Sequence, residues 1–171
     1  MRMVKKKVCL LGQFGVGKTS LIEKFVFNVF SEKYLSTIGV KVDKKEVVLP
    51  DGRRAVLMVW DLAGQEEENP APRAYLKGMS GYLLVADGTR PDTLEMVRRI
   101  HKTVGGQYPD VPFRLLINKS DLTADWKISP RDYEDYTRKG VEVHITSAKE
   151  GTAVEDAFVG LAGAMLRPEG G

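Results

Sequence analysis

Apolar residues along the chain gather in short continuous runs that alternate with stretches of helical spacing. Runs that end at glycine or at polar residues are typical of strands buried inside a sheet. We expect such strands at residues 6–11, 81–86, 113–117 and 141–146. Apolar positions three or four residues apart predict helices at residues 19–29, 92–104, 129–138 and 152–166.

Two further segments, 40–49 and 54–61, alternate apolar with polar residues and predict two more strands. Pro50, Asp51 and Gly52 lie between them and form a turn signal, so these strands are expected to pair as an antiparallel hairpin. Elsewhere strands and helices alternate, which predicts an α/β fold with a mostly parallel sheet and helices on both faces. Such sheets bind ligands at the carboxyl ends of their strands.

Size and composition narrow the possibilities. The chain has 171 residues, of which 43% are hydrophobic, and we expect residues 1–171 to form a single domain. A net charge of +3 is too small to indicate nucleic acid, so no nucleic-acid partner is expected. The run Lys5-Lys6-Lys7 is interpreted as a solvated lead-in to the first strand, with docking on anionic lipid as the alternative.

Cys9 is the one cysteine, and it lies in an apolar run, so no disulfide can form within the chain. A reducing compartment fits best, and we expect a cytoplasmic monomer. No apolar run approaches the length of a membrane span. The last five residues contain no cysteine, so no prenyl anchor is expected on this chain; either the protein is soluble or a tail is missing from this sequence.

The first chemical motif, residues 12–19, reads GQFGVGKT and matches the phosphate-loop pattern G-x-x-x-x-G-K-[ST] between a predicted strand and a predicted helix. Its glycines let the backbone approach phosphate oxygens, and the helix N-terminus favours negative charge. Lys18 is expected to reach the β- and γ-phosphates, and the Thr19 hydroxyl to ligate magnesium. The predicted phosphate-binding residues are Gly15, Val16, Gly17, Lys18, Thr19 and Ser20.

The second motif, Asp61-Leu62-Ala63-Gly64-Gln65, follows another predicted strand. A carboxylate at this place can hold magnesium through water, which is the role expected of Asp61. The amide of Gly64 can donate to the γ-phosphate, and Gln65 can orient an attacking water. Gln65 and Lys18 are therefore the predicted catalytic residues.

Two more motifs come after later strands and concern the base. Asn118, Lys119 and Asp121 form Asn-Lys-x-Asp, and residues 147–149 read Ser-Ala-Lys. A carboxylate such as that of Asp121 can accept two hydrogen bonds from the amino and imino edge of guanine. Adenine presents no such pair of donors, so a carboxylate at this position would discriminate against it. The two motifs together predict a guanine site.

These motifs, together with residues 34–40 (YLSTIGV) and 60–66 (WDLAGQE), make the chain similar to the Ras superfamily of small GTPases, and most similar to its Rab and Ras branches. The resemblance covers nearly the whole chain. It implies a single-domain P-loop fold with a six-stranded, mostly parallel sheet, one antiparallel edge strand and five helices. It also implies a molecular switch that binds GTP or GDP with Mg²⁺ and hydrolyses GTP to GDP and phosphate.

The resemblance further implies roles for individual residues. Thr37 would ligate magnesium with Thr19 and Asp61 and would sense the γ-phosphate. Tyr34 would close over the phosphates and Phe30 would pack edge-on against guanine. The expected base contacts are made by Asn118, Lys119, Asp121, Ser147, Ala148 and Lys149. Within this set, Lys119 would lie along the base. Ser147 and Ala148 would support Asp121, and a backbone amide there would meet the guanine oxygen.

The resemblance also implies partner surfaces on the two switch regions. Protein effectors, an exchange factor or a GTPase activator would bind between Phe30 and Val40 and between Gly64 and Gly78.

Phe14 departs from the family, whose members usually carry a small residue there, close to the γ-phosphate. A benzyl group can crowd the space needed by Gln65 or by an arginine finger, which predicts slow hydrolysis and resistance to finger-type activators. In the alternative, Phe14 turns outward and only covers the loop. Two other functions stay open: a GTP-loaded binding scaffold with little hydrolysis, and a phosphate-loop kinase or ATPase, for which no acceptor or lid segment is found.

The second switch departs as well. Glu66, Glu67 and Glu68 are followed by Pro70 and Pro72. Because proline restricts the backbone and removes an amide donor, the helix usual in this region is expected to start late or to be missing. The acidic run is interpreted as solvated, with a basic partner surface as the alternative.

Overall fold

The computed structural model describes residues 3–32, 37, 39–65 and 71–167. Its centre is a six-stranded sheet made of β1 (Val4–Leu11), β2 (Val40–Val48), β3 (Arg54–Leu62), β4 (Gly81–Asp87), β5 (Phe113–Asn118) and β6 (Val143–Ile145). The strand order is β2-β3-β1-β4-β5-β6, and only the edge strand β2 runs antiparallel to its neighbour. The predicted mostly parallel sheet with one antiparallel edge strand is confirmed, and so is the predicted hairpin.

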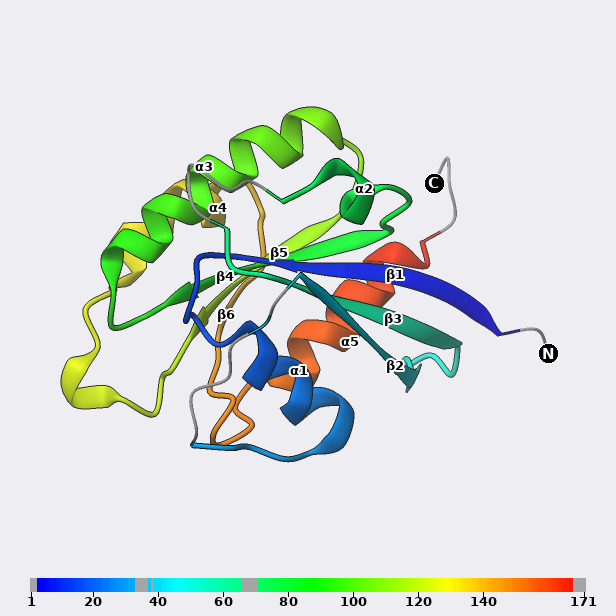
Figure 1. The fold of residues 1–171 in the computed structure, drawn as a ribbon, viewed down its shortest axis with the longest axis horizontal. Helices are drawn as coiled ribbons and strands as arrows, with labels where there is room; N and C mark the ends of the chain where they lie inside the picture. Colours follow the sequence, from blue (N-terminus) through cyan, green and yellow to red (C-terminus); the bar gives the residue numbers. More distant parts are fainter. Residues whose placement is uncertain (1–2, 33–36, 38, 66–70, 168–171) are drawn as a thin grey trace.

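Helices cover both faces of this sheet (Figure 1). One face carries α1 (Lys18–Phe27) and α5 (Val154–Met165), and the other carries α2 (Arg73–Leu76), α3 (Pro91–Gln107) and α4 (Glu134–Arg138). Each face encloses its own cluster of buried apolar side chains. The fully buried strand β4 and the buried second half of β1, residues 8–11, lie between the two clusters, as their continuous apolar runs predict.

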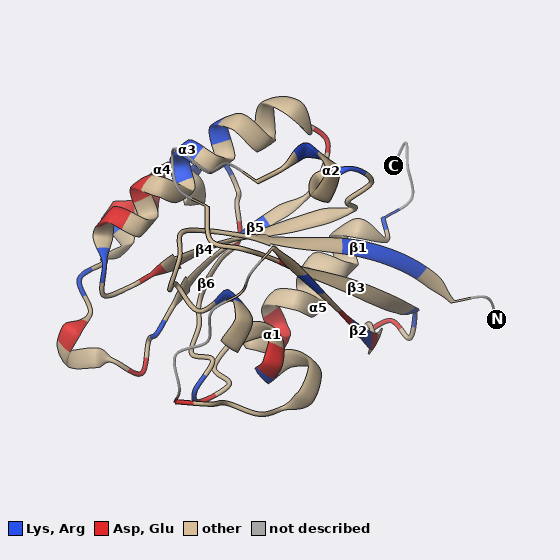
Figure 2. Cartoon of the chain, in the orientation of Figure 1, with Lys and Arg blue, Asp and Glu red and all other residues tan. Residues whose placement is uncertain are grey.

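The sequence-based bounds need three corrections. The first strand begins at Val4, so the three lysines belong to β1 and do not precede it (Figure 2). Lys7 is held against the fold, with Nζ 3.6 Å from the ring centre of Trp60 and 2.9 Å from the carbonyl of Lys77. Because successive residues of a strand face opposite sides, Lys6 points away from its two neighbours and the run forms no single basic patch.

The single helix expected over residues 129–138 is divided. A 3₁₀ turn, Pro130–Tyr133, comes first and α4 follows. Ser129 and Asp132 form a capping box around that turn, which closes it as a unit of its own. The first helix also ends earlier than predicted, because Asn28 adopts a left-handed conformation at φ 54° and caps it.

The second-switch helix starts late, as the prolines predict. α2 is four residues long and begins at Arg73, directly after Pro72. The acidic run at residues 66–68 and Pro70 lie outside the described residues.

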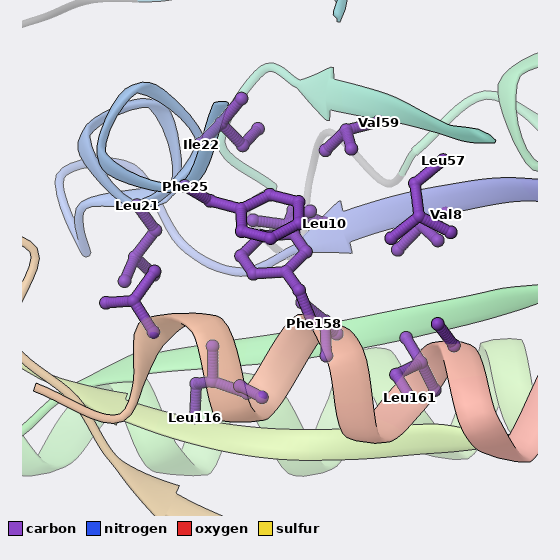
Figure 3. Packing of buried hydrophobic residues seen from close by; sticks show 14 of the residues in the cluster. Val8, Leu10, Leu21, Ile22, Phe25, Leu57, Val59, Leu116, Phe158 and Leu161 are labelled. Atoms are coloured by element: carbon purple, nitrogen blue, oxygen red, sulfur yellow. The ribbon is translucent and has the colours of Figure 1, made fainter. Parts of the chain in front are cut away.

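The cluster under α1 and α5 is centred on two stacked rings. Phe25 and Phe158 have ring centres 4.0 Å apart and planes within 3° of parallel (Figure 3). We expect Phe25→Leu to lower the free energy of unfolding by about 1 kcal/mol, because the ring contact is lost while most apolar area is kept. Urea unfolding measures this loss. Phe27→Leu is the control, since Phe27 is 55% exposed on the same helix; equal losses in both variants would contradict the account.

Candidate functional site

A cavity of about 280 Å³ opens at the carboxyl edge of the sheet. Its walls come from the loop after β1, the end of β3, the segment after β5 and the loop before α5. Predicted site residues that line it are Gly15, Gly17, Lys18, Thr19, Ser20, Phe30, Thr37, Asp61, Gly64, Asn118, Lys119, Asp121, Ala148 and Lys149. The lining does not include Val16, Gln65 or Ser147, and Tyr34 lies outside the described residues.

Two side chains hold carbonyl groups of the loop between β1 and α1. Lys18 Nζ donates to the carbonyl of Gly12 at 2.8 Å, and Asn118 Nδ2 donates to that of Val16 at 3.1 Å. For the amides of Gly15, Gly17 and Lys18, no acceptor is present among the described residues. Such amides at the start of a ten-residue helix form a binding site for an anion.

At two positions of the site, neighbouring atoms lie too close to the backbone to leave room for a side chain. Gly17 has φ 102°, and a Cβ atom there would lie 2.4 Å from Asn118 Nδ2. A Cβ atom on Gly64 would lie 2.4 Å from the Cα of Phe14, so the second motif packs directly on the loop backbone. Only glycine fits either place, which explains these two positions of the motifs in steric terms.

Lys18 is only 6% exposed and points back along its own loop. Besides Gly12, it reaches the carbonyl of Gln13 at 3.4 Å. Burial lowers the pKa of Lys18 to about 8, and the negative charge of Asp61 offsets this effect only in part. The site therefore contains a buried cation whose protein partners are mainly carbonyl oxygens, and an anion in the cavity would give it a stronger one.

Oxygen atoms converge around Asp61, which is 1% exposed. Its Oδ2 accepts hydrogen bonds from Thr19 Oγ1 at 2.6 Å and from Thr37 Oγ1 at 3.1 Å. Its Oδ1 is buried and has no hydrogen-bond partner among the described residues. Burial raises the pKa of Asp61 although both hydroxyls and the Lys18 charge oppose the shift. One carboxylate and two hydroxyls fit a hard divalent cation such as Mg²⁺, which would also give Oδ1 a partner.

The other end of the cavity is organised by the turn that follows β6. Ser147 Oγ donates to Asp121 Oδ1 at 2.8 Å, and Thr146 Oγ1 donates to Asn118 Oδ1 at 3.0 Å. Asp121 is thereby held with its carboxylate beside the cavity. Phe30 and Leu122, which are 37% and 41% exposed, offer apolar surface on the same walls, which suits a planar ring.

Gln65 does not reach into the cavity. It is 2% exposed, and its Oε1 accepts a hydrogen bond from the Gly12 amide at 2.9 Å. Its Nε2 donates to the carbonyl of Ala63, and its own amide donates to the carbonyl of Gly12 at 2.9 Å. In this conformation the Gln65 side chain connects the segment after β3 to Gly12, the first residue of the loop between β1 and α1. Phe14 lines the cavity and is 46% exposed, which places its ring at the rim.

Sequence reasoning missed one part of the site. Asp87 ends β4, is 1% exposed and lies beside Lys119. The sequence does contain a signal for Asp87: like Asp61 and Asn118, it is a polar residue at the carboxyl end of a buried strand.

The sheet order, the phosphate-binding loop and the aspartate after β5 together define a small GTPase of the Ras superfamily. The Ras family model matches residues 7–167, and the chain belongs to that family. It is 36% identical over 167 residues to Ras-related protein Rab-13 of Canis lupus familiaris, covering 96% of this chain and 82% of that protein. It is 38% identical over 154 residues to Ras-related protein RABA1b of Arabidopsis thaliana, covering 89% of this chain and 71% of that protein.

A third relative, Ras-related protein Rab-1C of Dictyostelium discoideum, is 33% identical over 161 residues, which cover 91% of this chain and 78% of that protein. The relatives support a small GTPase switch in general terms. Within the part of the chain that the structure describes, no helix is both long and apolar enough to cross a membrane.

Proposed function

We propose that residues 1–171 form one G domain that binds GTP or GDP with Mg²⁺ and hydrolyses GTP to GDP and phosphate. The observation that carries this proposal is the pairing of two features in one cavity. Amides for which the described residues supply no acceptor lie at one end, beside Lys18, and the Asp121 carboxylate lies at the other. A diphosphate at the first end and a guanine at the second would fit these donors and acceptors.

At the phosphate end, the amides of Gly15, Gly17 and Lys18 would donate to phosphate oxygens, and Lys18 Nζ would pair with the charge. Thr19, Thr37 and Asp61 would hold magnesium, whose charge, when it is bound, offsets that of the phosphates. Thr37 and Gly64 lie on the two switch loops and would both contact the γ-phosphate. Loss of that phosphate would remove an anchor that the two loops share.

A partner that binds only the ordered form would read the nucleotide state. Moving a two-state equilibrium from 1:99 to 99:1 takes about 5.5 kcal/mol of differential binding. A few charge-assisted hydrogen bonds of roughly 1.5–3 kcal/mol each can supply this. Effectors, an exchange factor or an activator would bind on the two switch regions, from Phe30 to Val40 and from Gly64 to Gly78.

Hydrolysis requires Gln65 to move. Its side chain would have to exchange the hydrogen bonds with Gly12 and Ala63 for a water beside the γ-phosphate. This feature, together with the Phe14 ring at the rim, favours a second candidate function, a GTP-loaded scaffold with little hydrolysis. Multiple-turnover phosphate release, with and without magnesium, separates the two functions: sustained magnesium-dependent release supports the hydrolase, and a single stoichiometric binding event without release supports the scaffold.

We expect Phe14→Gly to speed single-turnover GTP hydrolysis by about tenfold, because it opens the rim through which Gln65 would enter the cavity. Phe27→Ala is the control, since Phe27 is a largely exposed phenylalanine outside the cavity lining. An unchanged rate in Phe14→Gly would show that the ring does not obstruct the reaction.

A further inference from the structure

Asp87 is a buried anion between two basic side chains. Its Oδ2 lies 3.0 Å from Lys119 Nζ and 3.2 Å from Arg90 Nε. Its Oδ1 accepts hydrogen bonds from the amide and the hydroxyl of Thr89 at 2.8 and 2.7 Å. Burial alone would raise the pKa of Asp87, but the bonds from Thr89 and Lys119 outweigh it and hold the pKa below its ordinary value. Asp87 is therefore a charged anchor inside the fold.

Both cations reach from this anchor to the phosphate loop. Lys119 Nζ donates to the carbonyl of Gly15 at 2.8 Å, and Arg90 Nη2 donates to that of Phe14 at 3.0 Å. The C=O and N–H groups of one trans peptide point in opposite directions. Holding the Phe14 carbonyl outward therefore turns the Gly15 amide the other way, and Gly15 lines the cavity.

The segment that carries Arg90 is itself fixed in place. Arg90 is the residue before α3, whose first residue is Pro91. Trp126 covers Gly88 so closely that a Cβ atom there would lie 1.9 Å from its ring, and the Lys127 amide donates to the Gly88 carbonyl at 2.8 Å. These contacts fix the backbone of the segment from which the Arg90 side chain extends.

We propose that Arg90 is a positioning residue for the nucleotide: its guanidinium bridges Asp87 and the Phe14 carbonyl and so holds the Gly15 amide toward a bound diphosphate. The inference rests on the proposed binding of GTP and GDP. An arginine suits this role because two different nitrogens of one rigid plane serve the two acceptors, whereas a lysine has a single nitrogen. Arg90 does not line the cavity, so it acts through the loop and not on the ligand.

The test is the rate at which labelled GDP leaves the 171-residue chain in the presence of magnesium. Arg90→Met is expected to release GDP about tenfold faster, because one charge-assisted hydrogen bond to the loop is lost. The preference for GDP over ADP is expected to stay as in the unchanged protein, since Asp121 and its support are untouched. Arg90→Lys is expected to recover only part of the slow release.

Arg138→Met is the matched control, because Arg138 is also ion-paired, to Glu134 at 2.8 Å, but lies on α4 away from the loop. A release rate in Arg90→Met within twofold of the unchanged protein would overturn the inference, and so would an equal acceleration in the control. Loss of the GDP preference would also overturn it, because the effect would not be confined to the phosphates. Full recovery with lysine would refute the two-nitrogen bridge. If the unchanged protein bound no guanine nucleotide, the proposed function itself would fail.

Discussion

Asp121→Asn is expected to weaken GDP binding on the order of 10⁴-fold and to make xanthosine diphosphate the better ligand. The Asp121 carboxylate stands beside the cavity, oriented by the Ser147 hydroxyl at 2.8 Å. Asparagine would turn one acceptor into a donor facing the guanine amino group, so two donors would oppose each other. A site built to hydrogen-bond one edge rejects a ligand that lacks the matching group by about 10⁴ to 10⁵. Xanthine has a carbonyl oxygen in place of that amino group and would accept from the new amide.

Equilibrium titration with fluorescent GDP and xanthosine diphosphate measures both effects. Asp125→Asn is the control, because Asp125 lies exposed in the adjacent 3₁₀ turn, Thr123–Asp125, and does not line the cavity. If Asp121→Asn kept GDP affinity within a few-fold of the control, the assignment of the base end would be wrong.

Magnesium is expected to slow GDP release, and Asp61→Asn is expected to remove most of that slowing. In the presence of magnesium, the variant should release GDP about 10- to 100-fold faster, the usual effect of losing a group that orients a metal ligand. The carboxylate holds the Thr19 and Thr37 hydroxyls, and its second oxygen is buried with no hydrogen-bond partner among the described residues. The neutral amide carries less desolvation penalty. We therefore expect the magnesium-free, nucleotide-free variant to be at least as stable as the unchanged protein.

Release of labelled GDP with and without magnesium measures the first effect, and urea unfolding measures the second. Asp51→Asn serves as control, since Asp51 lies in the exposed turn of the hairpin. Loss of stability without any change in the magnesium effect would make Asp61 a purely structural residue and would contradict the proposed metal site.

Much of the fold follows from local pattern. Continuous apolar runs give β1 and β4, and the Pro-Asp-Gly turn gives the β2–β3 hairpin, because both signals are contained within a few residues. β1 begins two residues before its expected start, because Val4 and Lys5 are both exposed and do not form the continuous apolar run that indicates a buried strand. The late start of α2 could be predicted because a proline acts on the backbone next to it.

The candidate site also has parts that the local sequence predicts and parts that depend on contacts between distant residues. Motif residues such as Lys18 and Asp121 could be placed from spacing, because their strands end at one edge of the sheet. The burial of Gln65 could not, because it depends on hydrogen bonds with Gly12, 53 residues away. The link from Asp87 through Arg90 to Phe14 was equally hidden, since it joins two loops through side-chain contacts that leave no local pattern.

In the proposed function, one cavity combines a phosphate-binding loop with a carboxylate that selects guanine. The decisive measurement is equilibrium competition of GDP against ADP on the purified 171-residue chain, stripped of nucleotide and supplied with magnesium. We expect tight binding of GDP and a preference for GDP over ADP on the order of 10⁴-fold. Equal affinity for the two nucleotides, or no binding of GDP, would contradict the proposed function.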